Sequence, residues 1–166
     1  MFHTSIIALA ERVNHTLIGR SQMIVTAESC TGGLIAGALT DVPGSSAAVF
    51  GGYVTYANEA KQGMIGVDPE LIRQHGAVSE EVARAMAEGA LRSSGAAVAI
   101  AVTGIAGPGG GTEGKPVGRV HFAYADADKT VHLKKEFGDI GRQHVREETV
   151  KTALGMVLDG MGVPRP

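Results

Sequence analysis

Three possible nucleophiles stand side by side in one short turn of the sequence. Ser29, Cys30 and Thr31 follow an apolar run, and Gly32 and Gly33 come next, before a helical pattern begins. This order of apolar run, small polar residues and helix predicts a strand-to-helix turn. Backbone N–H groups at the start of a helix have no partner within it, so such a turn can hold a phosphate or a developing oxyanion. The turn is therefore the candidate active site.

The choice of nucleophile stays open on these residues alone. Ser29 also suits the purely structural role of a helix N-cap, because serine is favoured there. Cys30 is a rival nucleophile, since a thiol at a helix N-terminus can have a lowered pKa. A thiol mechanism would normally need a histidine nearby, and the six histidines offer no marked candidate. They also form no metal-binding cluster, so we expect no metal site.

A lysine further along the chain is a candidate general base. Lys61 falls in the first turn of a helix that we expect Asn58 to cap, where the helix macrodipole disfavours a protonated amine. Desolvation in a pocket would lower its pKa from about 10.4 toward neutrality. The neutral amine could then accept a proton from a serine hydroxyl. The position of Lys61 alone also fits a solvated surface lysine. Tyr56 could hydrogen-bond the Ser29 hydroxyl or the Lys61 amine, or it could pack with its hydroxyl outward.

A glycine-rich segment after Thr103 matches two nucleotide-binding patterns only in part. Residues 109–114 fit GxGxxG, and residues 109–115 fit the start of a Walker A loop. Pro116 stands where that loop needs Ser or Thr, and both patterns should open a helix rather than a strand. We therefore expect no nucleotide cofactor from these patterns. Thr103 and Gly104 leave a buried strand where α/β sheets commonly bind ligands, so the segment is either a pocket wall or a flexible connector.

The spacing of apolar residues indicates the elements that position these groups. Intervals of three and four residues predict helices, and short apolar runs between turn residues predict strands. The expected helices cover about 5–18, 31–40, 58–65, 68–75, 79–95 and a long segment after 141. The expected strands cover about 22–26, 47–56, 96–102, 117–125 and 130–137. Helices alternate with strands early and a strand pair comes late, which favours a three-layer α/β/α sandwich around a mixed sheet of about five strands.

Composition narrows the class of protein. The chain has 166 residues, of which 44% are hydrophobic, and this suits a single domain spanning 1–166. The 17 acidic and 15 basic residues give a net charge of -2 and form no basic run, so we expect no nucleic-acid partner. No apolar stretch is long enough for a membrane span, and the first residues do not read as a secretory leader. We therefore expect a cytoplasmic protein without a membrane partner. The single cysteine excludes an internal disulfide.

Five motifs in order resemble the CinA C-terminal domain family. They are TAESCTGG at 26–33, YVTYANEAK at 53–61, HGAVS at 75–79, TGIAGP at 103–108 and KPVG at 115–118. The likeness covers about residues 5–158. It implies a sandwich fold similar to anticodon-binding domains. Family members often carry an additional N-terminal domain resembling molybdopterin-binding proteins, which we expect this chain to lack, as the stand-alone deamidases do.

The resemblance also implies an activity and roles for residues. The activity is hydrolysis of the carboxamide of nicotinamide mononucleotide (NMN) to nicotinic acid mononucleotide and ammonia, in pyridine nucleotide recycling, with no cofactor. The family is described as a Ser/Lys amidohydrolase, which makes Ser29 the nucleophile and Lys61 the base. Tyr56 would orient Lys61 or relay a proton to the leaving nitrogen. Backbone N–H groups around Cys30 to Gly33 would stabilise the oxyanion.

The substrate phosphate and two other functions remain open. Arg142 and Arg146 begin the last helix after a glycine-containing turn, which suits a phosphate, although both also fit ordinary surface charges. A catalytically silent nucleotide-binding or regulatory domain is the main alternative to an enzyme. Binding of tRNA by analogy with the fold is a third, which the charge balance disfavours. The sequence leaves the oligomeric state open, a homo-oligomer included.

Overall fold

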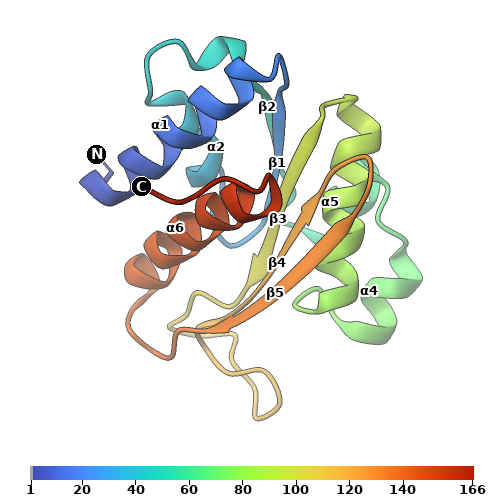
Figure 1. Cartoon of the computed structure of the whole chain (residues 1–166). Coiled ribbons are helices and arrows are strands. Elements are labelled where there is room, and N and C mark those ends of the chain that lie inside the picture. The colour runs from blue at the N-terminus through green and yellow to red at the C-terminus, as the bar shows by residue number, and fades with distance from the viewer. Residues whose placement is uncertain (1) are drawn as a thin grey trace.

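One five-stranded sheet lies between two layers of helices in the computed structural model, which describes residues 2–166 (Figure 1). The strands are β1 (Ile24–Glu28), β2 (Val49–Val54), β3 (Val98–Gly104), β4 (Arg119–Ala125) and β5 (Thr130–Glu136). The helices are α1 (Thr4–Gly19), α2 (Leu34–Thr40), α3 (Asn58–Ile65), α4 (Pro69–His75), α5 (Glu80–Ser94) and α6 (Arg142–Gly160), with a 3₁₀ turn, η1 (Ser45–Ala47). The predicted mixed α/β/α sandwich is confirmed.

The order of strands explains where a site can form. The sheet runs β2-β1-β3-β4-β5, and β1 is parallel to both β2 and β3. The late pair is antiparallel: β4 pairs with β3, and β5 with β4. Because parallel strands end at the same edge of a sheet, the segments after β1, β2 and β3 meet there. Ligands commonly bind at this edge in α/β folds.

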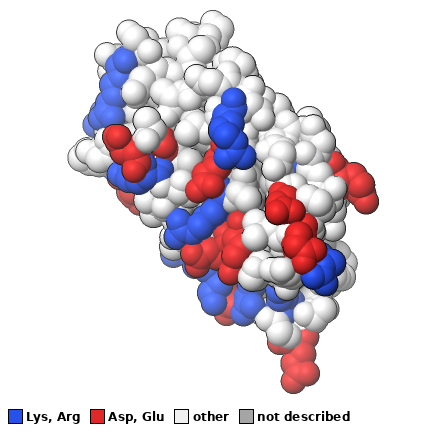
Figure 2. Space-filling model, turned by 90° about the vertical axis from the view of Figure 1, so that its right-hand side faces the viewer, with Lys and Arg blue, Asp and Glu red and all other residues white. Residues whose placement is uncertain are grey.

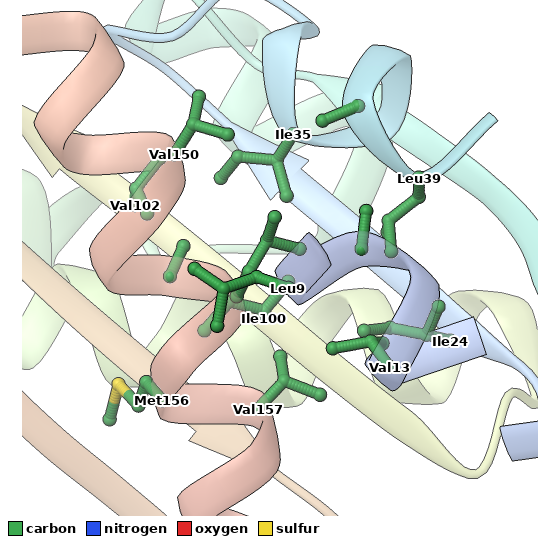
Figure 3. Close-up of a cluster of buried hydrophobic side chains, with 14 of the residues drawn as sticks. Leu9, Val13, Ile24, Ile35, Leu39, Ile100, Val102, Val150, Met156 and Val157 are labelled. Carbon is green, nitrogen blue, oxygen red and sulfur yellow. The ribbon is translucent and has the colours of Figure 1, made fainter. Parts of the chain in front are cut away.

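Each face of the sheet has its own apolar core. α1, α2 and α6 cover one face, where aliphatic side chains such as Leu9, Ile35, Ile100 and Val157 pack together (Figure 3). α3, α4 and α5 lie on the other face. There the sheet presents alanines, whose small side chains let α5 lie close to the strands.

A glycine allows two of these helices to touch. A Cβ atom on Gly89, in the middle of α5, would lie 2.0 Å from the carbonyl oxygen of Ile65, the last residue of α3. Any side chain at position 89 would therefore push the two helices apart. The close contact matters for function because α3 carries Lys61.

Several predicted helix boundaries are confirmed. The Asp68 side chain caps α4, with Pro69 as its first residue, and the Ser79 side chain caps α5. Gly95 ends α5 in the left-handed conformation. The glycine pair in β2 also behaves as predicted, because the β1–β2 register shifts there and leaves Phe50 as an extra residue.

Other boundaries differ from the predictions. β1 and β3 each begin and end two residues later than predicted. β1 continues past its predicted end at Thr26, because Ala27 and Glu28 still pair with β2 and β3. The helix predicted from Thr31 begins only at Leu34, so the turn is longer. Asn58 does not cap α3: it is the first helical residue, and Ala57 occupies the cap position without a side-chain hydrogen bond.

Two surface properties bear on partners. On the face that Figure 2 shows, basic and acidic side chains are intermixed rather than gathered by sign. Arg84 and Glu80 form an ion pair on α5. Between residues 2 and 166, every helix falls short of the length or the apolar character needed to span a bilayer.

Candidate functional site

A cavity of about 280 Å³ lies at the edge of the sheet where β1, β2 and β3 end. Its walls come from the turn after β1, the start of α3, the segment before α5, the loop after β3 and the start of α6. The lining residues are Ser29, Cys30, Tyr56, Asn58, Lys61, Ala77, Val78, residues 103–107, Gly109, Gly110 and Arg142. Two hollows of about 460 Å³ lie elsewhere, one beside α1 and one at the opposite end of the sheet. Neither is lined by a serine, threonine or cysteine, so we take the smaller cavity as the site.

Ser29 and Lys61 meet inside this cavity. The Nζ atom of Lys61 lies 3.2 Å from Oγ of Ser29. It also lies 3.0 Å from the carbonyl oxygen of Thr55 and 3.3 Å from that of Tyr56. Three oxygens therefore surround the amine, and only one of them belongs to a hydroxyl group.

This surrounding favours a neutral amine. The side chain of Lys61 is only 1% exposed, and its burial lowers the pKa below 10.5 because a buried ammonium loses its hydration. A neutral amine has two N–H bonds and one lone pair. The two carbonyl oxygens can accept the two hydrogens, which leaves the lone pair for the hydroxyl hydrogen of Ser29. The arrangement can thus remove a proton from serine.

The sheet and α3 hold the two groups in place. The amide N–H of Ser29 donates to Val102 on β3 at 3.1 Å, so the turn begins on the central strands. Thr55 donates its amide N–H to the carbonyl of Glu28 at 2.9 Å, which ties the segment before α3 to the end of β1. Lys61 lies in the first turn of α3, where the helix dipole further disfavours a protonated amine.

Cys30 is placed where a thiolate is costly. The residue is 5% exposed, and burial raises the pKa of its thiol to about 12, with the negative charge of Glu28 adding to the rise. The lowered pKa that a helix N-terminus could give a thiol is therefore absent here. Cys30 is protonated at neutral pH, which leaves Ser29 as the better nucleophile in the turn.

Tyr56 contacts Lys61 through its backbone rather than its hydroxyl. The carbonyl oxygen is the group near Nζ of Lys61, whereas the hydroxyl accepts a hydrogen bond from Nη2 of Arg142 at 3.0 Å. The Nη1 atom of Arg142 donates to the carbonyl of Gly107 at 2.9 Å. Arg142 thus connects the segment after β2 with the loop after β3 at the rim of the cavity.

Not all the site residues predicted from the sequence line the cavity. Arg146 donates to the carbonyls of Cys30 and Thr31, at 3.2 and 3.0 Å, and so holds the outside of the turn. Thr31, Gly32 and Gly33 are likewise outside the cavity lining. The turn therefore separates into an inner part, Ser29 and Cys30, and an outer part that Arg146 supports.

The start of α2 is not free to bind an oxyanion. Its first available amide N–H groups, those of Ile35 and Ala36, donate to the two carboxylate oxygens of Glu28 at 2.8 and 2.9 Å. The donors proposed from the sequence, the N–H groups of Cys30 to Gly33, all precede these residues, and among them the N–H of Gly32 donates to the carbonyl of Ser29 at 3.1 Å. No role for Glu28 was predicted from the sequence, although a carboxylate directly before a candidate nucleophile was an available signal.

The loop after β3 forms the opposite wall. Thr103 is buried and donates its hydroxyl to the carbonyl of Ala77 at 2.8 Å, which fixes the segment before α5 against the strand end. A Cβ atom on Gly104, the last residue of β3, would lie 2.9 Å from the carbonyl oxygen of Arg119 on β4. The pairing of these two strands therefore requires glycine at position 104. Within residues 2–166, no three His, Cys, Asp or Glu side chains are grouped for a metal ion.

Comparison with known proteins places this arrangement in a family. The sequence profile of the CinA C-terminal domain matches residues 6–161. The chain belongs to the CinA C-terminal domain family. The fold agrees, because a crystal structure of the competence/damage inducible protein CihA from Agrobacterium tumefaciens superposes with a TM-score of 0.94 and 51% identity, covering 96% of this chain and 97% of that one.

Curated relatives of this CinA-family chain are of two lengths. A CinA-like protein from Mycolicibacterium gilvum is 53% identical over 89% of the chain, which spans only 34% of that relative. The nicotinamide-nucleotide amidohydrolase PncC from Escherichia coli K12 is 47% identical over 93% of both chains. The chain thus matches about a third of the longer CinA-like proteins and nearly the whole of the amidohydrolase.

Proposed function

We propose that this chain hydrolyses the carboxamide of NMN to nicotinic acid mononucleotide and ammonia, in the recycling of pyridine nucleotides. The observation that carries the proposal is the contact between Ser29 and a desolvated Lys61 inside a cavity. Its support comes from the likeness to the amidohydrolase from Escherichia coli over nearly the full length of both proteins. The likeness to this relative thus supports NMN as the substrate, and the contact between Ser29 and Lys61 supports the mechanism.

In the proposed mechanism, Lys61 in its neutral form takes the hydroxyl proton of Ser29 as the oxygen attacks the amide carbon. The tetrahedral intermediate carries a negative oxygen, to which Cys30, lining the cavity next to Ser29, can offer its backbone N–H. Protonated Lys61 then returns the proton to the leaving nitrogen, the C–N bond breaks and ammonia departs. Water, deprotonated by Lys61, hydrolyses the acyl-enzyme and restores Ser29.

The phosphate of NMN would bind at the rim. Arg142 is exposed there, and its guanidinium donates hydrogen bonds to the carbonyl of Gly107 and the hydroxyl of Tyr56. Because the guanidinium is exposed, it can turn toward a phosphate without leaving a buried charge unpaired. Arg146 does not line the cavity and instead holds the outside of the turn, which makes it the poorer of the two candidates. We assign the phosphate contact to Arg142.

Release of ammonia from NMN by the purified protein is the direct test. Ser29→Ala should abolish turnover, whereas Cys30→Ala, the neighbouring substitution in the same turn, should leave the rate near that of the wild type. Wild-type protein that binds NMN without releasing ammonia would indicate the silent regulatory domain instead. An active Ser29→Ala variant would exclude the covalent serine mechanism while leaving the amidohydrolase activity in place.

A further inference from the structure

A buried carboxylate accepts four hydrogen bonds directly beside the proposed nucleophile. Glu28 is fully buried. Its Oε1 accepts from the hydroxyl of Thr31 at 2.7 Å and from the amide of Ile35 at 2.8 Å. Its Oε2 accepts from the hydroxyl of Thr26 at 3.1 Å and from the amide of Ala36 at 2.9 Å. One side chain is therefore bonded to the strand, the turn and the helix.

These contacts replace an ordinary helix cap. The residue at the cap position of α2 is Gly33, which has no side chain to accept from the first amide groups. Glu28 supplies that acceptor from the end of β1, and its charge also suits the positive end of the helix dipole. The five residues between Glu28 and Leu34 are thus fixed at both ends by the same carboxylate.

The fixed turn contains Ser29, the residue next to Glu28 in the chain. We propose that Glu28 is a positioning residue, which holds the turn so that Oγ of Ser29 stays within hydrogen-bond distance of Nζ of Lys61. The inference rests on the proposed function for its effect on rate. Glu28 does not line the cavity, and it acts only through the geometry of Ser29. A displacement of about 1 Å at a reacting atom can lower a rate roughly 100-fold.

Glutamine is the informative replacement at this position. It has nearly the shape of glutamate, but one of its two terminal groups is an NH₂ donor. The hydroxyls of Thr26 and Thr31 can rotate to accept from that group. The amides of Ile35 and Ala36 can only donate, and one amide faces each position of the Glu28 carboxylate. Either orientation of the glutamine therefore sets two donors against each other and displaces the turn from α2.

Two further variants separate positioning from stability. Val157→Ala removes methyl groups from the apolar core on α6, eleven residues, or about 16 Å of helix, beyond Arg146, which contacts the turn. It should lower the Tm without changing kcat. Thr31→Val keeps the side-chain shape and removes a single donor to Glu28. It decides the question if Glu28→Gln does not fold, and it should lower kcat in the same direction by a smaller factor.

The experiment measures kcat and KM for ammonia release from NMN, the Tm of each variant, and a crystal structure of Glu28→Gln or, failing that, Thr31→Val. We expect kcat of Glu28→Gln to fall roughly 100-fold with a much smaller change in KM, and Ser29 to move away from Lys61. Unchanged kcat with the Ser29–Lys61 contact retained would overturn the inference. So would an equal loss of kcat in Val157→Ala, because the loss would then follow stability. Wild-type protein without turnover would count against the proposed function alone, and the position of Ser29 in the variant structure would still test Glu28.

Discussion

The guanidinium of Arg142 and the hydroxyl of Tyr56 lie 3.0 Å apart at the rim of the cavity, with Arg142 as the donor. This relationship predicts different kinetic effects for the two residues. Arg142→Ala removes a charged partner of the phosphate worth about 1.5–3 kcal/mol, so KM should rise roughly 10- to 150-fold. Tyr56→Phe removes only one support of Arg142 and should raise KM about 2- to 10-fold with kcat little changed. Initial rates over a range of NMN concentrations measure both. A large fall in kcat for Tyr56→Phe would instead support the proton-relay role.

The lowered pKa of Lys61 predicts the pH dependence of activity. Only the neutral amine accepts the proton of Ser29, so kcat/KM should rise with pH as Lys61 deprotonates, with a midpoint below 10.5. Lys61→Arg should be inactive across the range, because a guanidinium does not deprotonate. Rates measured in buffers of constant ionic strength test this. A rate that is already independent of pH in the acid range, where Lys61 is protonated, would place the base elsewhere.

The same shift predicts how stability changes with pH. Above about pH 10.5 Lys61 is neutral in both the folded and the unfolded chain, and it contributes no proton-linked term. As the pH falls below 10.5, the unfolded chain binds the proton first, so the folded state loses stability until its own lowered pKa is passed. The Tm of the wild type relative to Lys61→Met should therefore increase from pH 7 toward pH 10.5. Differential scanning calorimetry of both proteins measures the difference, and a constant difference would mean that Lys61 titrates normally.

The buried Cys30 should be chemically inert. Burial raises the pKa of its thiol to about 12, so almost no thiolate exists at pH 7 to 8. Iodoacetamide should leave the native protein unmodified and modify the denatured protein, as measured by intact mass. Cys30→Ala should keep its kcat and lose about 1 kcal/mol of stability. Rapid alkylation of the native protein together with loss of activity would reopen the thiol mechanism.

The contact between α5 and α3 should depend on a single glycine. Gly89→Ala places a methyl group against the carbonyl of Ile65 and should destabilise the protein by about 1–3 kcal/mol or more. Gly63→Ala is the matched control, because a Cβ atom there meets nothing within 4 Å and alanine favours the helix by about 0.5–1 kcal/mol. Urea unfolding of the two variants should give changes of opposite sign. Equal effects would show that the helices can separate freely.

The elements of this fold were predictable where local chemistry specifies them. The caps at Asp68 and Ser79 and the stop at Gly95 follow from side-chain and backbone preferences that act within a few residues. The mixed sheet follows from the order of helices and strands. The end of β1 was predicted two residues too early, because burial of the charged Glu28 becomes favourable only through its partners on α2 and in the turn.

The site was predictable in its residue types and not in its contacts. The motifs brought Ser29 and Lys61 to attention, and their 3.2 Å contact supports the assignment. Two of the three neighbours of the Lys61 amine are backbone carbonyls, which every residue has, so no pattern of side chains reveals them. The contacts of Arg146 with the turn are between residues more than 100 positions apart and depend on how α6 packs.

The two walls of the cavity are attached to the sheet in different ways. The amide of Ser29 continues the hydrogen-bond ladder of the central strands through Val102, so this wall opens only when the middle of the sheet unfolds. The opposite loop is tied to the sheet at its base, where Ile105 bonds to Arg119 and Gly118 bonds back to Ile105. Because local opening of a loop generally needs less free energy than unfolding of central strands, we expect the amide of Ser29 to exchange with solvent more slowly than the amides of the loop.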